Sequence, residues 1–449
     1  MFKLPQEIKE IFEIFKKNNF QIYLVGGAVR DLLLGKNPTN FDFTTNANPS
    51  QIQKLFSESF YNNDYGTVSI PINLEKEKVS TFVEITPFRA ESDYQDYRHP
   101  QKIVWAKTLD EDLARRDFTI NAIAYDGLKI YDPFEGQIDL KNKIIKTVGE
   151  PDKRFNEDAL RLMRAIRFAS QLGFLIEENT RRSIEKNSHL ITKISWERIR
   201  DEFLKILKSD HPSEGILFLR NTRLLHYILP ELDVCFSIPQ KSPKRHHIYD
   251  VGTHLVMSLK YCPSKDEITR FATLIHDIGK AKTFKKDQNT GLITFYNHEV
   301  VGTKLAEKIA DRFRLSNKQK EKLVRLVKYH QFTVSEIQTD KAIRRFIREV
   351  GKEYLQDILD LRVGDRVGSG AKPSSWRFEL FKKRLIEVQK EPFKITDLKV
   401  NGNDVMEILK IKPGPKVGEV LKNLFEKVVN KKLPNDRQAL LEEIKKIGL

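Results

Sequence analysis

The sequence predicts an α+β fold, with a head built around one mixed β-sheet and a long helical region after it. Three observations support this prediction. The chain has 449 residues, too many for a single hydrophobic core, so we expect two to four domains. Short β-branched segments that partly alternate apolar and polar residues occur before Lys146. After Lys146, apolar residues recur almost everywhere at helical spacing.

The head is expected to begin with an amphipathic helix in residues 1–20, because apolar residues recur there at helical spacing. A second helix is expected in AVRDLLLG (28–35). Four short apolar or β-branched runs predict strands: 21–25, 41–45, 67–73 and 79–88. A hairpin is predicted from FTINAIAYDG (118–127) and KIYDPFEG (129–136), around Asp126-Gly127, a dipeptide typical of tight turns between strands.

Clusters of Pro, Gly and Lys interrupt the helical region and mark candidate boundaries at 238–247, 368–376 and 412–418. The resulting division has four parts: a head (1–147), a helical neck (148–225), a helical body (226–370) and a helical tail (371–449).

The chain is strongly basic, with 78 Lys and Arg against 62 Asp and Glu, a formal net charge of +16. Either the surface is simply rich in lysine, or the partner is a polyanion such as a nucleic acid. No apolar run is long enough to span a membrane, and the start MFKLPQEIKE lacks the apolar region of a signal peptide. With only two cysteines, Cys235 and Cys262, a cytoplasmic location is expected.

The stretch LVGGAVRDLLLGKNPTNFDFTT (24–45) places Gly26 and Gly27 between a predicted strand and a predicted helix. Glycine lets a ligand approach the backbone closely, and a helix N-terminus offers free N–H groups to an anion. Arg30, one turn later, could add a phosphate contact. Glycine pairs are also common in ordinary turns, so the pair alone does not establish a phosphate site.

Asp42 lies on the strand that follows this helix. Because side chains alternate along a strand, an acid at position 40 would share its face. Two carboxylates at this spacing can hold two Mg²⁺ ions about 3.5–4 Å apart for in-line transfer of a nucleotide. Position 40 is Asn40, however, whose single amide oxygen is neutral.

Three motifs in this order, 24–45, RRDFTINA (115–122) and EDALRLMRAIRFASQLGF (157–174), resemble the class II tRNA nucleotidyltransferase family. That family contains CCA-adding enzymes, CC-adding and A-adding relatives, and bacterial poly(A) polymerases. The resemblance covers at least residues 20–205. It implies a polymerase-β-like head with Mg²⁺, followed by a helical neck, body and tail, with tRNA, CTP and ATP as partners.

The third motif places Glu157, Arg161 and Arg164 on one face of an expected helix, with Asp158 three residues before Arg161. By itself this spacing is typical of a ladder of surface ion pairs. The resemblance implies instead that Asp158 and Arg161 select the base, with Arg164 beside them. The carboxylate accepts from the exocyclic amine of cytosine or adenine, and the guanidinium donates to the neighbouring acceptor.

The second motif supplies Arg115, Arg116, Asp117 and Asn121, which by resemblance lie along the ribose and triphosphate of the nucleotide. The polar segment 91–114 resembles the flexible loop that helps such enzymes change from C to A addition, which favours complete CCA addition.

The family pattern has acids at both 40 and 42, so Asn40 suggests a variant of low activity. Three explanations are open: an engineered Asp-to-Asn change, a natural loss of transferase activity, or replacement by another acid. Glu84, on the predicted strand 79–88, is the candidate for replacement. We favour the first explanation, because every other motif is intact.

A second set of residues lies in the body. FATLIHDIGK (271–280) contains His276 and Asp277; His254, His298, His330 and Asp365 lie elsewhere. The set resembles the HD phosphohydrolase superfamily, in which His254, His276, Asp277 and Asp365 would bind a divalent metal. His298 and His330 would bind a second metal or a phosphate. Imidazole and carboxylate suit several divalent metals, so the metal's identity stays open.

The leading functional hypothesis is an enzyme that builds or repairs the 3′-CCA end of tRNA. The alternatives are a poly(A) polymerase or partial CC- or A-adding enzyme, and, of a different class, a tRNA-binding protein with an inactive head and an active HD phosphohydrolase. The oligomeric state is not predicted.

Overall fold

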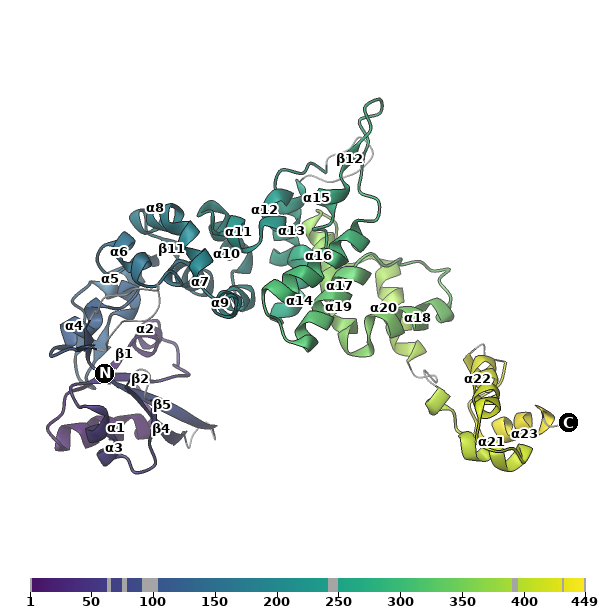
Figure 1. The fold of residues 1–449 in the computed structure, drawn as a ribbon, viewed down its shortest axis with the longest axis horizontal. Coiled ribbons are helices and arrows are strands. Elements are labelled where there is room, and N and C mark those ends of the chain that lie inside the picture. The colour runs from purple at the N-terminus through teal and green to yellow at the C-terminus, as the bar shows by residue number, and fades with distance from the viewer. Residues whose placement is uncertain are drawn as a thin grey trace.

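The structure is a computed structural model that describes residues 2–62, 66–74, 79–90, 104–240, 249–389, 395–429 and 432–447. The described parts form an α+β head, followed by helices to the C-terminus (Figure 1). The predicted fold class is therefore confirmed. Most of the segment 91–114, predicted to contain the flexible loop, lies outside the described residues.

The head holds one mixed sheet of seven strands in the order β3-β4-β5-β2-β1-β8-β9. Only β2 and β5 pair in parallel; the other neighbours in this sheet are antiparallel. The strands are β1 (Ile22–Val25), β2 (Asp42–Thr45), β3 (Phe60–Asn62), β4 (Thr67–Leu74), β5 (Val79–Pro87), β8 (Ala124–Tyr125) and β9 (Ile130–Tyr131). The helices of the head are α1 (Gln6–Lys17), α2 (Gly27–Leu33), α3 (Pro49–Leu55), α4 (Leu109–Ala114) and α5 (Gly136–Asn142), and a separate two-stranded sheet joins β6 (Arg89–Ala90) to β7 (Val104–Trp105).

The two faces of the sheet differ. Leu24, Phe43 and Ile85 are cross-strand neighbours on one face and are buried beneath α1, whose Phe12 ring lies 5.2 Å from the Phe43 ring. Asp42 and Glu84 are neighbours on the opposite face, and both are exposed. Because register and pleat fix this alternation, Asp42 cannot turn into the apolar core without shifting the whole strand.

The neck contains α6 (Pro151–Glu157), α7 (Arg161–Leu172), α8 (Glu178–Asn187), α9 (Trp196–Lys208) and α10 (Pro212–Asn221). Helix α11 (Leu224–Ile228) crosses from the neck into the body, and α12 (Pro230–Cys235) follows it. The body contains α13 (Val251–Lys260), α14 (Glu267–Ile275), α15 (Lys280–Thr283), α16 (His298–Arg312), α17 (Asn317–Tyr329), α18 (Asp340–Val350), α19 (Leu355–Gly368) and α20 (Trp376–Val388). Two short sheets pair β10 (Ile144–Ile145) with β11 (Leu175–Ile176) and β12 (Lys285–Lys286) with β13 (Ile293–Thr294).

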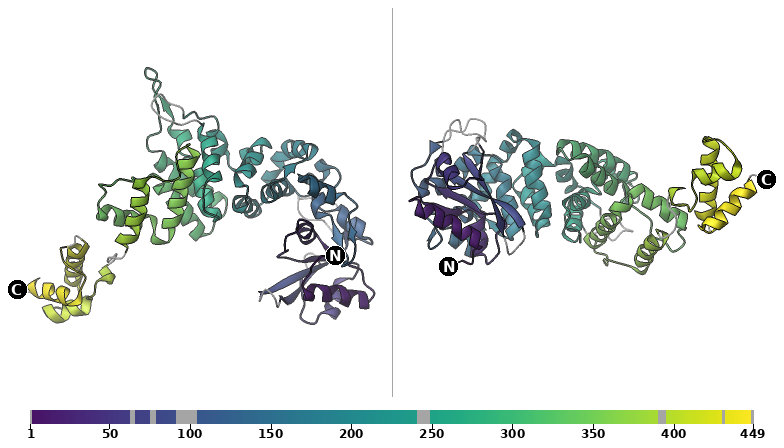
Figure 2. Two further views of the ribbon diagram at one scale, coloured as in Figure 1. Left: turned by 180° about the vertical axis from the view of Figure 1, so that it is seen from behind. Right: turned by 90° about the horizontal axis from the view of Figure 1, so that it is seen from below.

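The last helices, α21 (Gly402–Leu409), α22 (Pro415–Val429) and α23 (Arg437–Ile447), share a small core of their own. In Figure 2 they lie at the end of the molecule opposite the head. Helix α20 belongs to the main core, through Phe378 and Phe381 among others. The small separate core begins at Leu398.

One local prediction is wrong. Residues 157–164 are not one continuous helix, because α6 ends at Glu157 and α7 begins at Arg161. Asp158 has an extended backbone (φ −139°, ψ 105°), and its carboxylate accepts a hydrogen bond from the backbone N–H of Leu160 at 3.0 Å. Asp is well suited to such a local turn, because its short side chain competes with helical hydrogen bonding. The break frees the side chain of Asp158 from the face of either helix.

Candidate functional site

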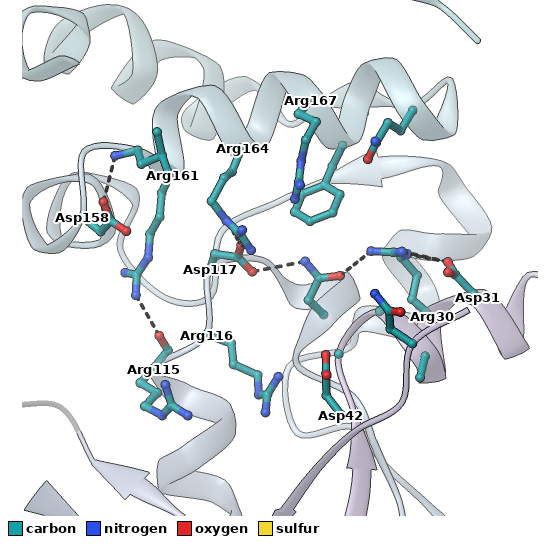
Figure 3. Close-up of a pocket in the computed structure, with 18 of the residues that line it drawn as sticks. Arg30, Asp31, Asp42, Arg115, Arg116, Asp117, Asp158, Arg161, Arg164 and Arg167 are labelled. Atoms are coloured by element: carbon teal, nitrogen blue, oxygen red, sulfur yellow. Dashed lines mark hydrogen bonds and ion pairs between the residues drawn. The ribbon is translucent and has the colours of Figure 1, made fainter. Parts of the chain in front are cut away.

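A cavity of about 700 Å³ lies where the head meets the neck (Figure 3). Seven arginines and four aspartates are among its lining residues, so its charge suits a polyanionic ligand with some internal neutralisation. All the head and neck residues predicted from the three motifs line it: Gly26, Gly27, Arg30, Asn40, Asp42, Arg115, Arg116, Asp117, Asn121, Asp158, Arg161 and Arg164.

The glycine pair forms the start of α2 at the edge of this cavity. Gly26 has φ +69°, a left-handed conformation that favours glycine, and a Cβ there would lie 3.2 Å from Nη1 of Arg116. Arg116 is held in turn by the buried Asp112 at 3.1 Å. Gly26 thus allows the guanidinium of Arg116 to pack against the backbone at the N-terminus of α2.

A chain of polar contacts joins α2 to α7 across the cavity (Figure 3). Arg30 donates to Asp31 and, through Nη1, to the amide oxygen of Asn121 at 2.9 Å. The amide nitrogen of Asn121 donates to Asp117, which also accepts from Nε and Nη2 of Arg164 at 2.8 and 2.6 Å. Although burial opposes ionisation, Arg164 outweighs it and lowers the pKa of Asp117 to about 2. Asp117 therefore fixes two of the predicted ligand-binding side chains.

Arg161 is fixed by three hydrogen bonds. Its Nη1 donates to Glu157 at 2.6 Å and to the carbonyl of Arg154 at 3.1 Å, and its Nη2 donates to the carbonyl of Arg115 at 3.0 Å. A guanidinium has five N–H donors, so two remain for a ligand in a fixed orientation.

Asp158 is oriented from its other side. Its second oxygen accepts from Nη2 of Arg198, on α9, at 3.0 Å. A carboxylate has about four acceptor positions, so it retains the capacity to accept from a ligand.

The carboxylates beside position 40 could hold a hard cation. Asp42 lies directly opposite Glu84 on the neighbouring parallel strand, so their side chains share one face. Although the Asp42 side chain reaches solvent, partial desolvation by the surrounding atoms and the nearby charge of Glu84 raise its pKa, while Arg116 opposes the shift. Two acids that repel each other in this way fit a divalent cation, which removes the repulsion. Glu84 does not line the nucleotide-sized cavity, whereas Asn40 and Asp42 do.

Sequence reasoning missed several residues of this cavity. Arg167 and Phe168 continue the face of α7 that carries Arg164, at spacings of three and four residues, so helical periodicity could have found them. The guanidiniums of Arg30, Arg164 and Arg167 lie 5.3, 5.4 and 4.2 Å from the centre of the Phe168 ring. Arg198 is 40 residues from Asp158 in the chain, and no local pattern predicts their contact.

A second cavity, of about 530 Å³, lies in the body and is lined by five of the six residues predicted for the HD site, three of them among the four predicted metal ligands. Six side chains from five helices or their ends converge on this cavity or its wall: His254, His276, Asp277, His298, His330 and Asp365. Two triads could each hold an ion. His254, His276 and Asp365 form the first, and Asp277, His298 and His330 the second, with the ligand atoms of each within 4.8 Å of one another.

Asp277 lies between the two triads. Its Oδ2 is 3.5 and 3.4 Å from Nε2 of His254 and His276, and its Oδ1 is 3.1 and 3.4 Å from Nε2 of His298 and His330. One carboxylate thus faces both groups of imidazoles, an arrangement suited to bridging two cations.

The imidazoles are oriented for metal binding. Nδ1 of His276, His298 and His330 lies 2.7–2.8 Å from a backbone carbonyl, which leaves each Nε2 directed toward Asp277. Nε2 of His298 and Nε2 of His330 are buried and lie near Asp277, but neither forms a hydrogen bond of good geometry among the described residues. Burial opposes a charge on His276, but Asp277 and Asp365 outweigh it and raise the pKa of that imidazole to about 10. The same negative charge of Asp277 and Asp365 that favours a proton on His276 would favour a metal cation between these side chains.

The fold and the first cavity define a nucleotidyltransferase: a glycine-initiated helix and a strand carboxylate meet a helical neck rich in arginine. The comparisons agree. Residues 22–146 match the family described as Poly A polymerase head domain. Residues 173–236 match the probable RNA- and SrmB-binding site of polymerase A, and residues 283–444 match a putative tRNA nucleotidyltransferase domain 2.

Relatives span the whole chain. A CCA-adding enzyme of Ligilactobacillus salivarius is 33% identical over 99% of this chain and 98% of its own length. An A-adding tRNA nucleotidyltransferase of Deinococcus radiodurans is 32% identical over 90% of both chains. The crystal structure of a Bacillus stearothermophilus CCA-adding enzyme in complex with CTP has a TM-score of 0.72 and 27% identity, covering 99% of this chain and 98% of that one. The chain belongs to the CCA-adding enzyme family of tRNA nucleotidyltransferases.

Among the described residues, no helix combines the length and the apolar character needed to cross a membrane.

Proposed function

We propose that this chain adds or repairs the 3′-CCA end of tRNA, using CTP and ATP. One observation carries the proposal: residues from three separated motifs line a single cavity that joins Asp42 of the head to Asp158 and Arg161 of the neck. A nucleotide placed between them would have its phosphates beside α2 and its base at the neck. The family members include an A-adding enzyme at similar identity, so incorporation of CTP is the property that separates the two activities.

Base choice follows from the two fixed side chains. Asp158 can only accept, and the free N–H groups of Arg161 can only donate. Cytosine and adenine present an amine beside a ring acceptor and satisfy both. Uracil and guanine present a carbonyl where the amine would be, which leaves a carboxylate facing an oxygen and a donor facing a donor. UTP and GTP are therefore rejected because their bases leave Asp158 and Arg161 without hydrogen-bond partners and place like groups against each other.

The remaining residues bind and orient the nucleotide. Arg30 and Arg164, held by Asn121 and Asp117, would contact its phosphates or ribose, with Arg115 and Arg116 on the opposite wall. Asp42, with Glu84 and Asn40 beside it, would hold Mg²⁺. When bound, Mg²⁺ supplies charge neutralisation at the reacting phosphate and lowers the pKa of a bound hydroxyl. In this proposal the base lies at the neck and the phosphates lie beside α2, which supports a reaction beside Asp42.

Arg161→Ala should reduce CTP and ATP incorporation by about 1–3 kcal/mol of transition-state stabilisation and relax the preference over UTP and GTP. The reason is that the ring acceptor loses its donor while Asp158 remains. Initial rates with each nucleotide measure both effects. Arg182→Ala is the matched control, because it removes an ion pair with Glu178, four residues earlier, on a solvent-exposed face. Full selectivity in Arg161→Ala would disprove the assignment of Arg161.

We also propose that the chain as it stands transfers nucleotides slowly. Asn40 offers a neutral oxygen where the family pattern has a carboxylate, and an amide cannot bridge two cations comparably. Glu84 gives Asp42 a second acid, on the neighbouring strand and not at position 40. Nucleotide and tRNA binding should persist, because the cavity is otherwise complete.

A second activity is favoured by the geometry of the body. We infer that the six convergent ligands bind up to two divalent transition metals and that the site hydrolyses a phosphorylated substrate. The supporting observation is the pair of buried triads around Asp277, with Lys280, Arg362 and Arg366 also lining the cavity. When bound, such metals activate water for attack on phosphorus. The cationic side chains would hold the phosphate.

Purified protein should carry or take up a divalent transition metal that is largely lost in His276→Ala and in Asp277→Ala. Asp277 faces both triads, so its loss should lower the metal content more than loss of His276. Elemental analysis gives the stoichiometry. His226→Ala is the control, since this imidazole is mostly exposed, lies outside the cavity lining and forms an ion pair with Asp233. Metal content that is unchanged in both site variants would contradict the metal site; tRNA extension should be indifferent to all three changes.

A further inference from the structure

The cavity that fits the nucleotide lies on one side of Asp42. Its lining residues come from α2, the segment 39–42, the second motif and the neck, and none comes from β5. In an in-line displacement the attacking hydroxyl and the leaving pyrophosphate lie on opposite sides of the phosphorus. If the proposed transferase function holds, on which this inference rests, the 3′ end of the RNA must approach Asp42 from the opposite side, over β5.

The register of the sheet identifies what lies there. Asp42 of β2, Glu84 of β5, Ser69 of β4 and Phe60 of β3 are successive cross-strand neighbours, so their side chains share the face that carries Asp42. Phe82 precedes Glu84 by two residues and therefore points to the same face. From strand spacing and rise, its Cα lies about 8 Å from that of Asp42.

These two phenylalanines are unusually exposed. Phe82 is 56% exposed and Phe60 is 63% exposed, whereas Val83 and Ile85, on the other face of β5, are fully buried. The two rings lie 6.3 Å apart at 70°, an edge-to-face pair that presents one ring face beside another ring's edge. Figure 1 shows β4 and β5 on the side of the sheet away from the neck helices, so no neck helix covers them.

We propose that Phe82 and Phe60 form a stacking platform for the unpaired 3′-terminal bases of the tRNA acceptor strand. During CCA addition the RNA ends first in the base that precedes the CCA sequence and then in C, so a contact that reads the hydrogen-bonding edge of one base would not serve every step. An aromatic ring accepts any base, because every base has a π-face. The platform would hold the 3′ end of the RNA beside Asp42 without distinguishing one terminal base from another.

The test uses tRNA that lacks the CCA sequence and ends at the unpaired nucleotide directly before it. Phe82→Ala should raise the KM for this tRNA about tenfold and leave the KM for CTP unchanged, because stacking is a contact to the RNA alone. Phe60→Ala should have the same effect to a smaller degree, since it lies further from Asp42. Phe82→Trp should restore the wild-type KM, which a merely structural role in the strand would not require.

Tyr61→Ala is the matched control. Tyr61 follows Phe60 on the same edge strand and is 40% exposed, but it pairs with the buried Val68 on the opposite face. Its loss should leave the KM for tRNA unchanged. The fluorescence of 2-aminopurine at the terminal position of the RNA provides a direct reading of stacking. It should be quenched on binding to the unaltered chain without Mg²⁺, and less quenched with Phe82→Ala.

An RNA with an abasic terminal nucleotide completes the test. It has no base to stack, so Phe82→Ala should no longer change its KM. The inference is overturned if Phe82→Ala and Phe60→Ala bind and extend tRNA as the unaltered chain does, or if the abasic RNA remains sensitive to Phe82. The proposed transferase function fails separately, if neither the unaltered chain nor Asn40→Asp binds or extends tRNA at all.

Discussion

Asn40→Asp should raise the rate of CTP incorporation by several orders of magnitude, with little change in the affinity for CTP. Position 40 precedes β2, which begins at Asp42, so the strand alternation predicted from the sequence does not extend to it; the new carboxylate would instead join Asp42 in the lining of the same cavity. It would give each Mg²⁺ a charged ligand in place of a neutral amide oxygen. Nucleotide affinity should hold, because the arginines and Asp158 are unaffected. Single-turnover rates at saturating CTP measure the gain.

Comparable turnover in Asn40→Asp and in the unaltered chain would contradict this expectation. It would show that Asp42 and Glu84 suffice as a pair and that a second carboxylate at position 40 is not needed for transfer. Asn37→Asp is a suitable control, since it adds the same charge to the same segment outside the cavity lining.

Glu84→Gln should remove most of the activity that the unaltered chain retains, about tenfold or more, and should remove less in the Asn40→Asp background. With Asn40 in place, Glu84 is the acid directly beside Asp42 and carries the charge that position 40 lacks. The two changes should therefore be non-additive, as expected for groups that serve one cation. Rates of the two single variants and the double variant give the coupling directly.

Equal losses from Glu84→Gln in both backgrounds would show that Glu84 acts independently of position 40. Glu58→Gln, an exposed acid elsewhere in the head, should have no effect in either background.

Much of the head follows from local sequence. The strands β1, β2, β4 and β5 are short runs of β-branched and apolar residues, and the hairpin of β8 and β9 turns at Asp126-Gly127 as predicted. Residues 118–123 were expected in the same hairpin, yet Thr119–Asn121 form a 3₁₀ turn that presents Asn121 to Arg30. Periodicity did not show this, because the turn depends on its contacts with α2 and α5.

What the sequence could not provide is register and long-range pairing. The sequence singled out Glu84 as the candidate acid, but only the parallel pairing of β2 and β5 shows that it lies directly opposite Asp42. The salt bridge between Asp158 and Arg198 joins α9 to a break between two helices that were expected to be continuous. The division of the body ligands into two triads around Asp277 depends on five helices packing together, which spacing alone does not specify.

The measurement that tests the central claim most directly is extension of tRNA lacking its CCA end, with CTP, ATP or both, and with product lengths resolved to one nucleotide. The unaltered chain and Asn40→Asp are compared at equal concentration. The account predicts two added nucleotides with CTP alone, three with both nucleotides, and no addition to this RNA with ATP alone, slowly for the unaltered chain and rapidly for Asn40→Asp. Addition of A without prior C, long A tails, or no addition by either protein would contradict it.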